Sequence, residues 1–110
     1  MEFYIIGDRE MVLAFRLTGI SGTVAETRRE ILDAFNRITG KGGELALPVD
    51  EVPKVLILTE SAAAQIEEEE REWQMQGKFP LIVEIPGLGG HIEGKKTLTD
   101  AIREAIGVQI

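Results

Sequence analysis

The residues whose types and spacing could do chemistry gather in one glycine-rich stretch. "PGLGGHIEGKKT", residues 86–97, follows an apolar run and precedes an amphipathic segment. A phosphate-binding P-loop needs Gly, four residues, Gly, Lys and then Ser or Thr, and Gly89–Lys95 supplies all but the last. Lys96 stands where the magnesium-binding hydroxyl belongs, and Thr97 comes one place late, about 100 degrees further around a helix axis. The loop also comes after every predicted strand, so the pattern favours a flexible tether. We expect no nucleotide and no other cofactor.

Two acids follow predicted strands and could act at the edge of a sheet. Asp8 and Glu60 stand where ligands of parallel sheets bind. A phospho-acceptor receiver domain would need an Asp after its third strand and a lysine after its last, where this chain has Thr59 and Pro86. The acids are better interpreted as helix caps or first-turn residues, with a metal between them as a weaker alternative. The single histidine, His91, has no acid or nucleophile beside it, so we predict no catalytic or metal site.

The closing segment is the most informative feature. Leu98, Ile102 and Ile106 recur every four residues, and Ala101 and Ala105 widen the apolar stripe. Burying the three large side chains would contribute roughly 1.5–3 kcal/mol each. Such a short helix is marginal alone in water and needs a surface to pack on. It could fold onto its own sheet or swing out to a partner helix, and we favour the partner.

Composition narrows the classes of protein. The net charge of −7 argues against nucleic acid and anionic membrane surfaces as main partners. There are no cysteines, so disulfides and thiolate sites are excluded. The apolar runs are far too short to span a membrane, and the N-terminus lacks the features of a signal peptide. We expect a cytoplasmic protein without direct membrane insertion.

The chemistry-bearing residues must be positioned by alternating strands and helices. Apolar runs predict strands at 3–7, 54–60 and 79–86, with a short one within 19–25. Helical periodicity predicts helices at 9–17, 25–40 and 61–78, the last capped by Ser61. This order indicates an α/β fold, a four-stranded parallel sheet with helices on both faces, plus a glycine-linked C-terminal helix. The corresponding division is a sheet domain at 1–86, a tether at 87–97 and a partner-binding helix at 98–110.

Two further segments carry local expectations. The run "EEEERE" is interpreted as the solvated face of its helix. Residues Lys41–Pro53 are predicted to form a loop with room for a short extended segment.

Five motifs in order resemble the F subunit of the V-type (A/V-type) rotary ATPase or ATP synthase, a component of the central stalk. They are "IIGDRE", "AFRLTGI", "VLILTE", "PLIVEIPG" and "LTDAIREAIGVQI", and together they cover nearly the whole chain. The segment "GKGGELALPVDEVP" departs from the family because it is longer than the usual connection.

The resemblance implies a receiver-like or Rossmann-like sheet and a non-catalytic role. It implies that the C-terminal helix docks on the coiled-coil D subunit of the rotor through Leu98, Ile102, Ala105 and Ile106. Further implied partners are the funnel subunit that joins the stalk to the membrane ring and, indirectly, the catalytic head of A and B subunits. The chain would then be peripheral to the membrane through the complex. The alternatives are a receiver-like signalling module with Asp8 as phospho-acceptor, and a nucleotide-binding protein that uses Lys95.

Overall fold

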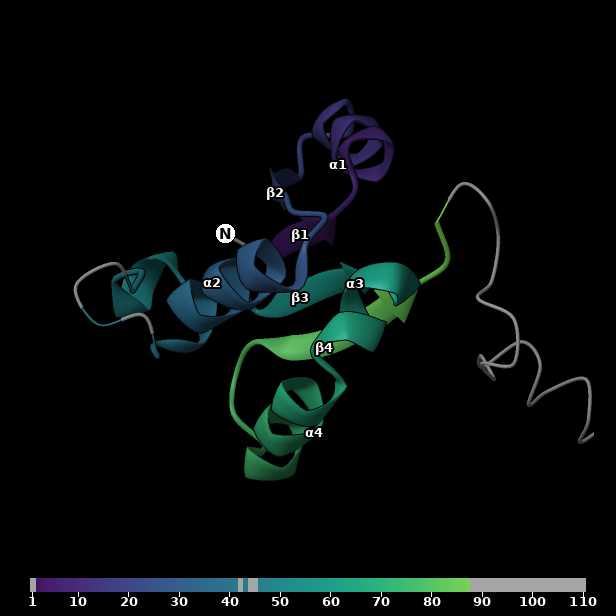
Figure 1. Cartoon of the computed structure of the whole chain (residues 1–110). Helices are drawn as coiled ribbons and strands as arrows, with labels where there is room; N and C mark the ends of the chain where they lie inside the picture. The colour runs from purple at the N-terminus through teal and green to yellow at the C-terminus, as the bar shows by residue number, and fades with distance from the viewer. Residues whose placement is uncertain (1, 42, 44–45, 88–110) are drawn as a thin grey trace, which may run out of the picture.

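The computed structural model describes residues 2–41, 43 and 46–87, which form one parallel sheet covered by helices (Figure 1). The strands are β1 (Phe3–Gly7), β2 (Ser21–Val24), β3 (Val55–Thr59) and β4 (Leu81–Ile85). The helices are α1 (Arg9–Arg16), α2 (Arg28–Thr39), α3 (Glu60–Gln65) and α4 (Glu67–Gln76), with a 3₁₀ turn, η2, at Val49–Glu51. The predicted tether, except Gly87, and the predicted terminal helix lie outside the described residues.

The four strands lie in the order β2-β1-β3-β4, and every neighbouring pair is parallel. Parallel strands covered on both faces are apolar throughout, and β1 and β3 fit this pattern. Ile5 and Ile6 in β1 and Leu56 and Leu58 in β3 are fully buried. The predicted α/β class and parallel sheet are confirmed.

The helices are divided unequally between the two faces of the sheet. Going from β2 to β3 and from β3 to β4 moves across the sheet in the same direction, so right-handed crossovers place these connections on one face. The step from β1 to β2 runs the other way and places α1 on the opposite face. Figure 1 shows α2 and α3 in front of the sheet and α4 below β4.

Each face has its own hydrophobic cluster. On the α2 face, fully buried Phe35 of α2 and Ile66 pack with Ile6 and Leu58 of the sheet. On the α1 face, Met11 and Val12 pack on Ile5 and Ile57. The buried side chains are Met11 and Val12 in α1 and Ile31, Phe35 and Ile38 in α2.

Helix α2 begins and ends as its local sequence dictates. The Thr27 side chain accepts from the Glu30 backbone N–H at 3.2 Å, and the Glu30 carboxylate accepts from the Thr27 backbone N–H at 3.2 Å. This is a capping box, which satisfies two otherwise unpaired donors. At the other end, Gly40 takes a φ of 83°, the left-handed conformation that glycine adopts without strain.

The single helix predicted at 61–78 is wrong, because the chain breaks at Ile66. That residue has φ −127° and ψ 35°, which ends α3 and starts α4. Thr59, not Ser61, caps α3, since its hydroxyl accepts from the Ala62 N–H at 3.4 Å. Helix α3 packs on β1, β3 and β4, whereas the main strand contact of α4 is with the edge strand β4, and the chain turns between the two helices.

Two local expectations also need correction. Within the acidic run, Glu70 is only 5% exposed, so the run is not entirely a solvated face. In the loop at 41–53, the regular structure described is a 3₁₀ turn rather than an extended segment. Among the described helices, none is long and apolar enough to cross a membrane.

Candidate functional site

The carboxyl ends of β1 and β3, where ligands of parallel sheets bind, are closed by direct packing. A Cβ atom added to Gly7 would lie 2.5 Å from Cγ2 of Thr59, so only glycine allows this approach. Thr59 is fully buried, and its hydroxyl lies 3.3 Å from the Ser61 hydroxyl as well as capping α3. The Thr59 side chain therefore packs directly against Gly7 at this edge.

The two acids at this edge lie at the starts of the helices that follow. Asp8 occupies the N-cap position of α1, although its side chain makes no capping hydrogen bond. Glu60 is the first residue of α3 and is 3% exposed. Within residues 2–41, 43 and 46–87, no three acidic or histidine side chains are grouped closely enough to hold a metal ion. Pro86 follows β4 at the place where a receiver domain carries its lysine.

The predicted partner-binding residues Leu98, Ile102, Ala105 and Ile106 lie outside the described part of the chain. The P-loop-like residues Gly89–Lys95 lie outside it as well. The structure does show where the chain leaves the sheet. Strand β4 ends at Ile85, at the carboxyl edge of the sheet, and the chain continues toward the predicted tether from there.

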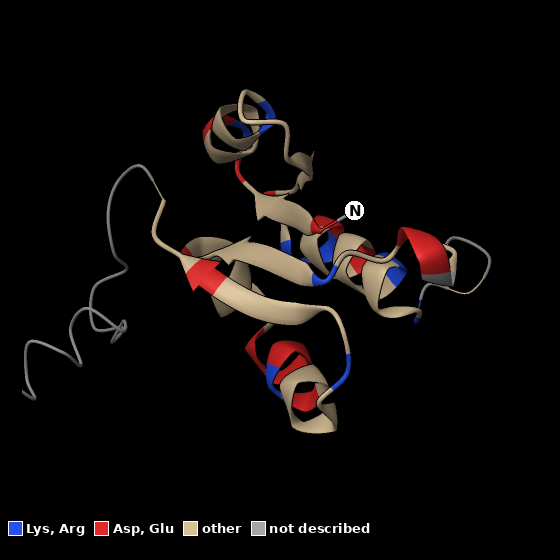
Figure 2. Cartoon of the chain, turned by 180° about the vertical axis from the view of Figure 1, so that it is seen from behind, with Lys and Arg blue, Asp and Glu red and all other residues tan. Residues whose placement is uncertain are grey.

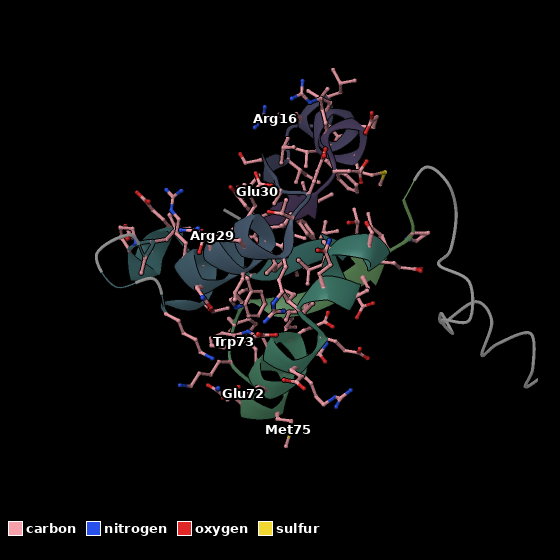
Figure 3. The ribbon with its side chains drawn as sticks, viewed as in Figure 1. Arg16, Arg29, Glu30, Glu72, Trp73 and Met75 are labelled. Carbon is pink, nitrogen blue, oxygen red and sulfur yellow. The ribbon has the colours of Figure 1, made fainter. Side chains whose placement is uncertain are left out.

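A groove that the sequence did not predict runs between β2 and α2. Its volume is about 840 Å³. The Tyr4 hydroxyl hydrogen-bonds Thr23 on its floor, and Glu30 and Arg37 of α2 line it. In Figure 3, Glu30 projects from α2 near β2. The hydrogen bonds from Thr27 lower the pKa of Glu30, because they stabilise its charged form.

An ion pair joins α2 to the break between α3 and α4. One terminal nitrogen of the Arg28 guanidinium donates a hydrogen bond to the backbone oxygen of Gln65. The other terminal nitrogen lies 2.7 Å from Oε2 of Glu69. The hydrogen bond from Arg28 lowers the pKa of Glu69, and the same bond raises the pKa of Arg28. The sequence carried no signal of this ion pair, because Arg28 and Glu69 are far apart in the chain.

Helix α4 is anchored by one large side chain. Trp73 is 6% exposed, and its indole Nε1–H donates to the backbone oxygen of Pro80 at 2.9 Å. Figure 3 shows Trp73 toward the body of the protein and Met75 at the outer end of the same helix. Trp73 and Ile66, the residue at the break, both enter the hydrophobic cluster on the α2 face.

Comparison with known proteins then identifies the family. The model of the ATP synthase (F/14-kDa) subunit family matches residues 3–106. The chain belongs to this family. It is 34% identical over 110 residues to the F subunit of the A-type ATP synthase of Pyrococcus furiosus, covering all of this chain and 98% of the relative. It is 32% identical over 112 residues to the F subunit of Thermococcus sibiricus, with the same two coverages.

A more distant relative also matches over the full length of this chain. The A-type ATP synthase F subunit of Methanocaldococcus jannaschii is 28% identical over 111 residues, which are 100% of this chain and 99% of the relative. The resemblance drawn from five short motifs is thus confirmed along nearly the whole chain. The family match also includes the apolar positions of the closing segment.

Proposed function

We propose that this chain is a non-catalytic central-stalk subunit of an ion-translocating A/V-type ATP synthase. It binds the coiled-coil D subunit of the rotor through Leu98, Ile102, Ala105 and Ile106 and supports the rotational coupling of ATP synthesis or hydrolysis to ion transport. It also lies near the funnel subunit and acts on the catalytic head only indirectly. It works on the cytoplasmic side, peripheral to the membrane.

The observation that carries this proposal is the family match over residues 3–106. The relatives are named as subunits of an ATP synthase, that is, as parts of a larger assembly. The direct packing of the buried Thr59 side chain against Gly7 at the carboxyl edge of the sheet is consistent with a non-catalytic role. An apolar stripe at helical spacing suits a partner that is itself a helix.

The test is binding to the purified D subunit, measured by pull-down and by titration calorimetry. Ile102→Asp and Ile106→Asp place a charge inside the proposed contact and should weaken binding at least tenfold. Arg103→Asp puts the same carboxylate outside the apolar stripe of the predicted helix and should leave binding within about twofold. If the stripe variants bind as tightly as the parent chain, the interface assignment is wrong.

Two activity measurements accompany the binding test. The isolated chain should hydrolyse no ATP above the buffer rate. Incubation with a small phosphodonor should leave the mass of the chain unchanged. A phosphoryl adduct on Asp8 would instead support a receiver-like signalling module.

A further inference from the structure

Three exposed apolar side chains lie on the α1 face of the sheet, away from α1 itself. Phe3 is 47% exposed, Leu81 52% and Val83 46%. Phe3 pairs in register with Val55, which pairs with Leu81, so Phe3, Val55 and Leu81 form one row across β1, β3 and β4. We call Phe3, Leu81 and Val83, with the half-buried Val55 and Ile85, the bare strip.

Alternation along β4 assigns the bare strip to this face. Ile82 packs into the cluster under α2 and α3, so Leu81 and Val83 point to the other side. Val55 and Ile85 pack against the cluster under α1, which confirms the assignment. Helix α1 packs on β1 and β2. In Figure 2 this face is toward the viewer, and none of the described helices lies in front of β3 and β4.

The dimensions of the bare strip suit one helix. Neighbouring strands are about 4.8 Å apart, so the step from β1 across β3 to β4 spans about 10 Å, close to the diameter of a helix. Along β4, the distance from Leu81 to Ile85 is about 13 Å, or two to three helical turns. Contiguous exposed apolar patches on soluble proteins are often interaction sites.

We propose that the bare strip is a second docking surface for the coiled-coil partner, and that the apolar side of one partner helix covers it. This rests on the proposed function, in which the same partner is held by Leu98, Ile102 and Ile106. If the stripe at 98–106 is used on the partner, it cannot also cover the strip. Both apolar surfaces of the chain are then buried by one molecule.

The path of the chain supports a two-point attachment. The chain leaves the sheet after Ile85, at one end of the bare strip, and residues 87–97 follow. A segment of that length reaches at most about 36–40 Å even when it is fully extended. A partner gripped by residues 98–106 is therefore held near the strip at an effective concentration in the millimolar range. A weak apolar surface gains occupancy in this way without a large interface of its own.

A second copy of this chain is a poorer occupant. Each copy carries a net charge of −7, which opposes face-to-face association. A second copy would also need the small strip to supply the whole interface, whereas specific protein pairs bury about 1,200–2,000 Å² in total.

The first experiment measures binding of the D subunit to variants of the full chain. Leu81→Lys and Val83→Lys put an ammonium group under the proposed partner helix and should weaken binding at least tenfold. Met75→Lys is the matched control, since Met75 is an apolar side chain that is 82% exposed on α4, away from the strip. It should bind like the parent chain. Urea unfolding followed by Trp73 fluorescence verifies that each variant is folded.

The Ile102→Asp variant separates the two proposals. Weak binding by both Ile102→Asp and Val83→Lys supports the two-point attachment. Weak binding by Ile102→Asp alone overturns the bare-strip proposal and leaves the proposed function standing. Weak binding by Val83→Lys alone supports docking on the bare strip and shows that the assignment of the C-terminal helix as a binding element is wrong. Parent-like binding by both overturns both proposals.

The second experiment identifies the occupant by thiol labelling, which is specific because the chain has no cysteine. In Val83→Cys, a maleimide should react readily with the free chain and at least tenfold more slowly after the D subunit is added. Met75→Cys should react equally in both states. If Val83→Cys is already protected in the free chain and Ile102→Asp unmasks it, the chain's own tail covers the strip and the proposal is wrong. Protection that grows with the concentration of the free chain would indicate a second copy and would also overturn it.

Discussion

Replacing Gly7 with alanine tests how closely β1 and β3 pack at the carboxyl edge of the sheet. The new methyl group would lie 2.5 Å from Cγ2, 3.1 Å from Oγ1 and 3.4 Å from Cβ of Thr59. Thr59 is fully buried, and its hydroxyl caps α3, so the side chain cannot rotate away without losing that bond. Overpacking of this kind costs about 1–3 kcal/mol, and we expect Gly7→Ala to be near the upper end.

The contact can be relieved from the other side. Thr59→Ser removes Cγ2 and keeps the hydroxyl that caps α3. Alone it should cost about 1 kcal/mol, the usual loss for one buried methyl group. In the double variant the alanine methyl occupies the vacated space, with Oγ1 at 3.1 Å as its nearest neighbour. The loss of unfolding free energy in the double variant should therefore be about 1–2 kcal/mol smaller than the sum of the losses in the two single variants.

Urea unfolding gives the four free energies of this cycle, and the single tryptophan, Trp73, reports them by fluorescence. A cost below about 0.5 kcal/mol for Gly7→Ala would show that the strand ends are not tightly packed. Simple additivity of the two substitutions would show that Thr59 is not the obstacle. Either result would refute the view that a buried threonine closes this edge.

Three further predictions concern the helices. Thr27→Ala removes the capping box of α2 and should lower the free energy of unfolding by about 1 kcal/mol, measured in urea. Trp73→Phe keeps most of the packing but leaves the buried Pro80 oxygen without its donor, so a loss of about 1–3 kcal/mol is expected by circular dichroism. Because Arg28 lowers the pKa of Glu69, the charged carboxylate stabilises the fold above the unfolded value of 4.5. That contribution disappears as the pH falls through the lower, folded pKa. Glu69→Gln should therefore be less stable than the parent chain at neutral pH and differ less from it at about pH 3, and an equal gap at both pH values would contradict this.

Local sequence predicted most elements because their signals are local. The β1 run, Phe3–Gly7, was predicted to the residue, since a short apolar stretch ended by Gly-Asp has few other interpretations. The stripe of α2 and the glycine after it placed that helix within a few residues. The break at Ile66 was missed, because the periodicity of 61–78 continues through it. The chain turns there so that Trp73 of α4 packs near β4. The residues around Ile66 carry no information on the position of β4, which follows later in the chain.

The sequence by itself determined that this chain is an alternating α/β domain with a closing apolar stripe, and its motifs were enough to indicate the family. These properties depend on residue order and side-chain type. The tertiary structure decided which apolar positions are covered and which are bare. Leu56 and Leu81 look alike in sequence, yet Leu56 is fully buried and Leu81 is 52% exposed. The direction of each crossover sets which helix lies on which face, and none of the described helices covers the β4 side of the α1 face.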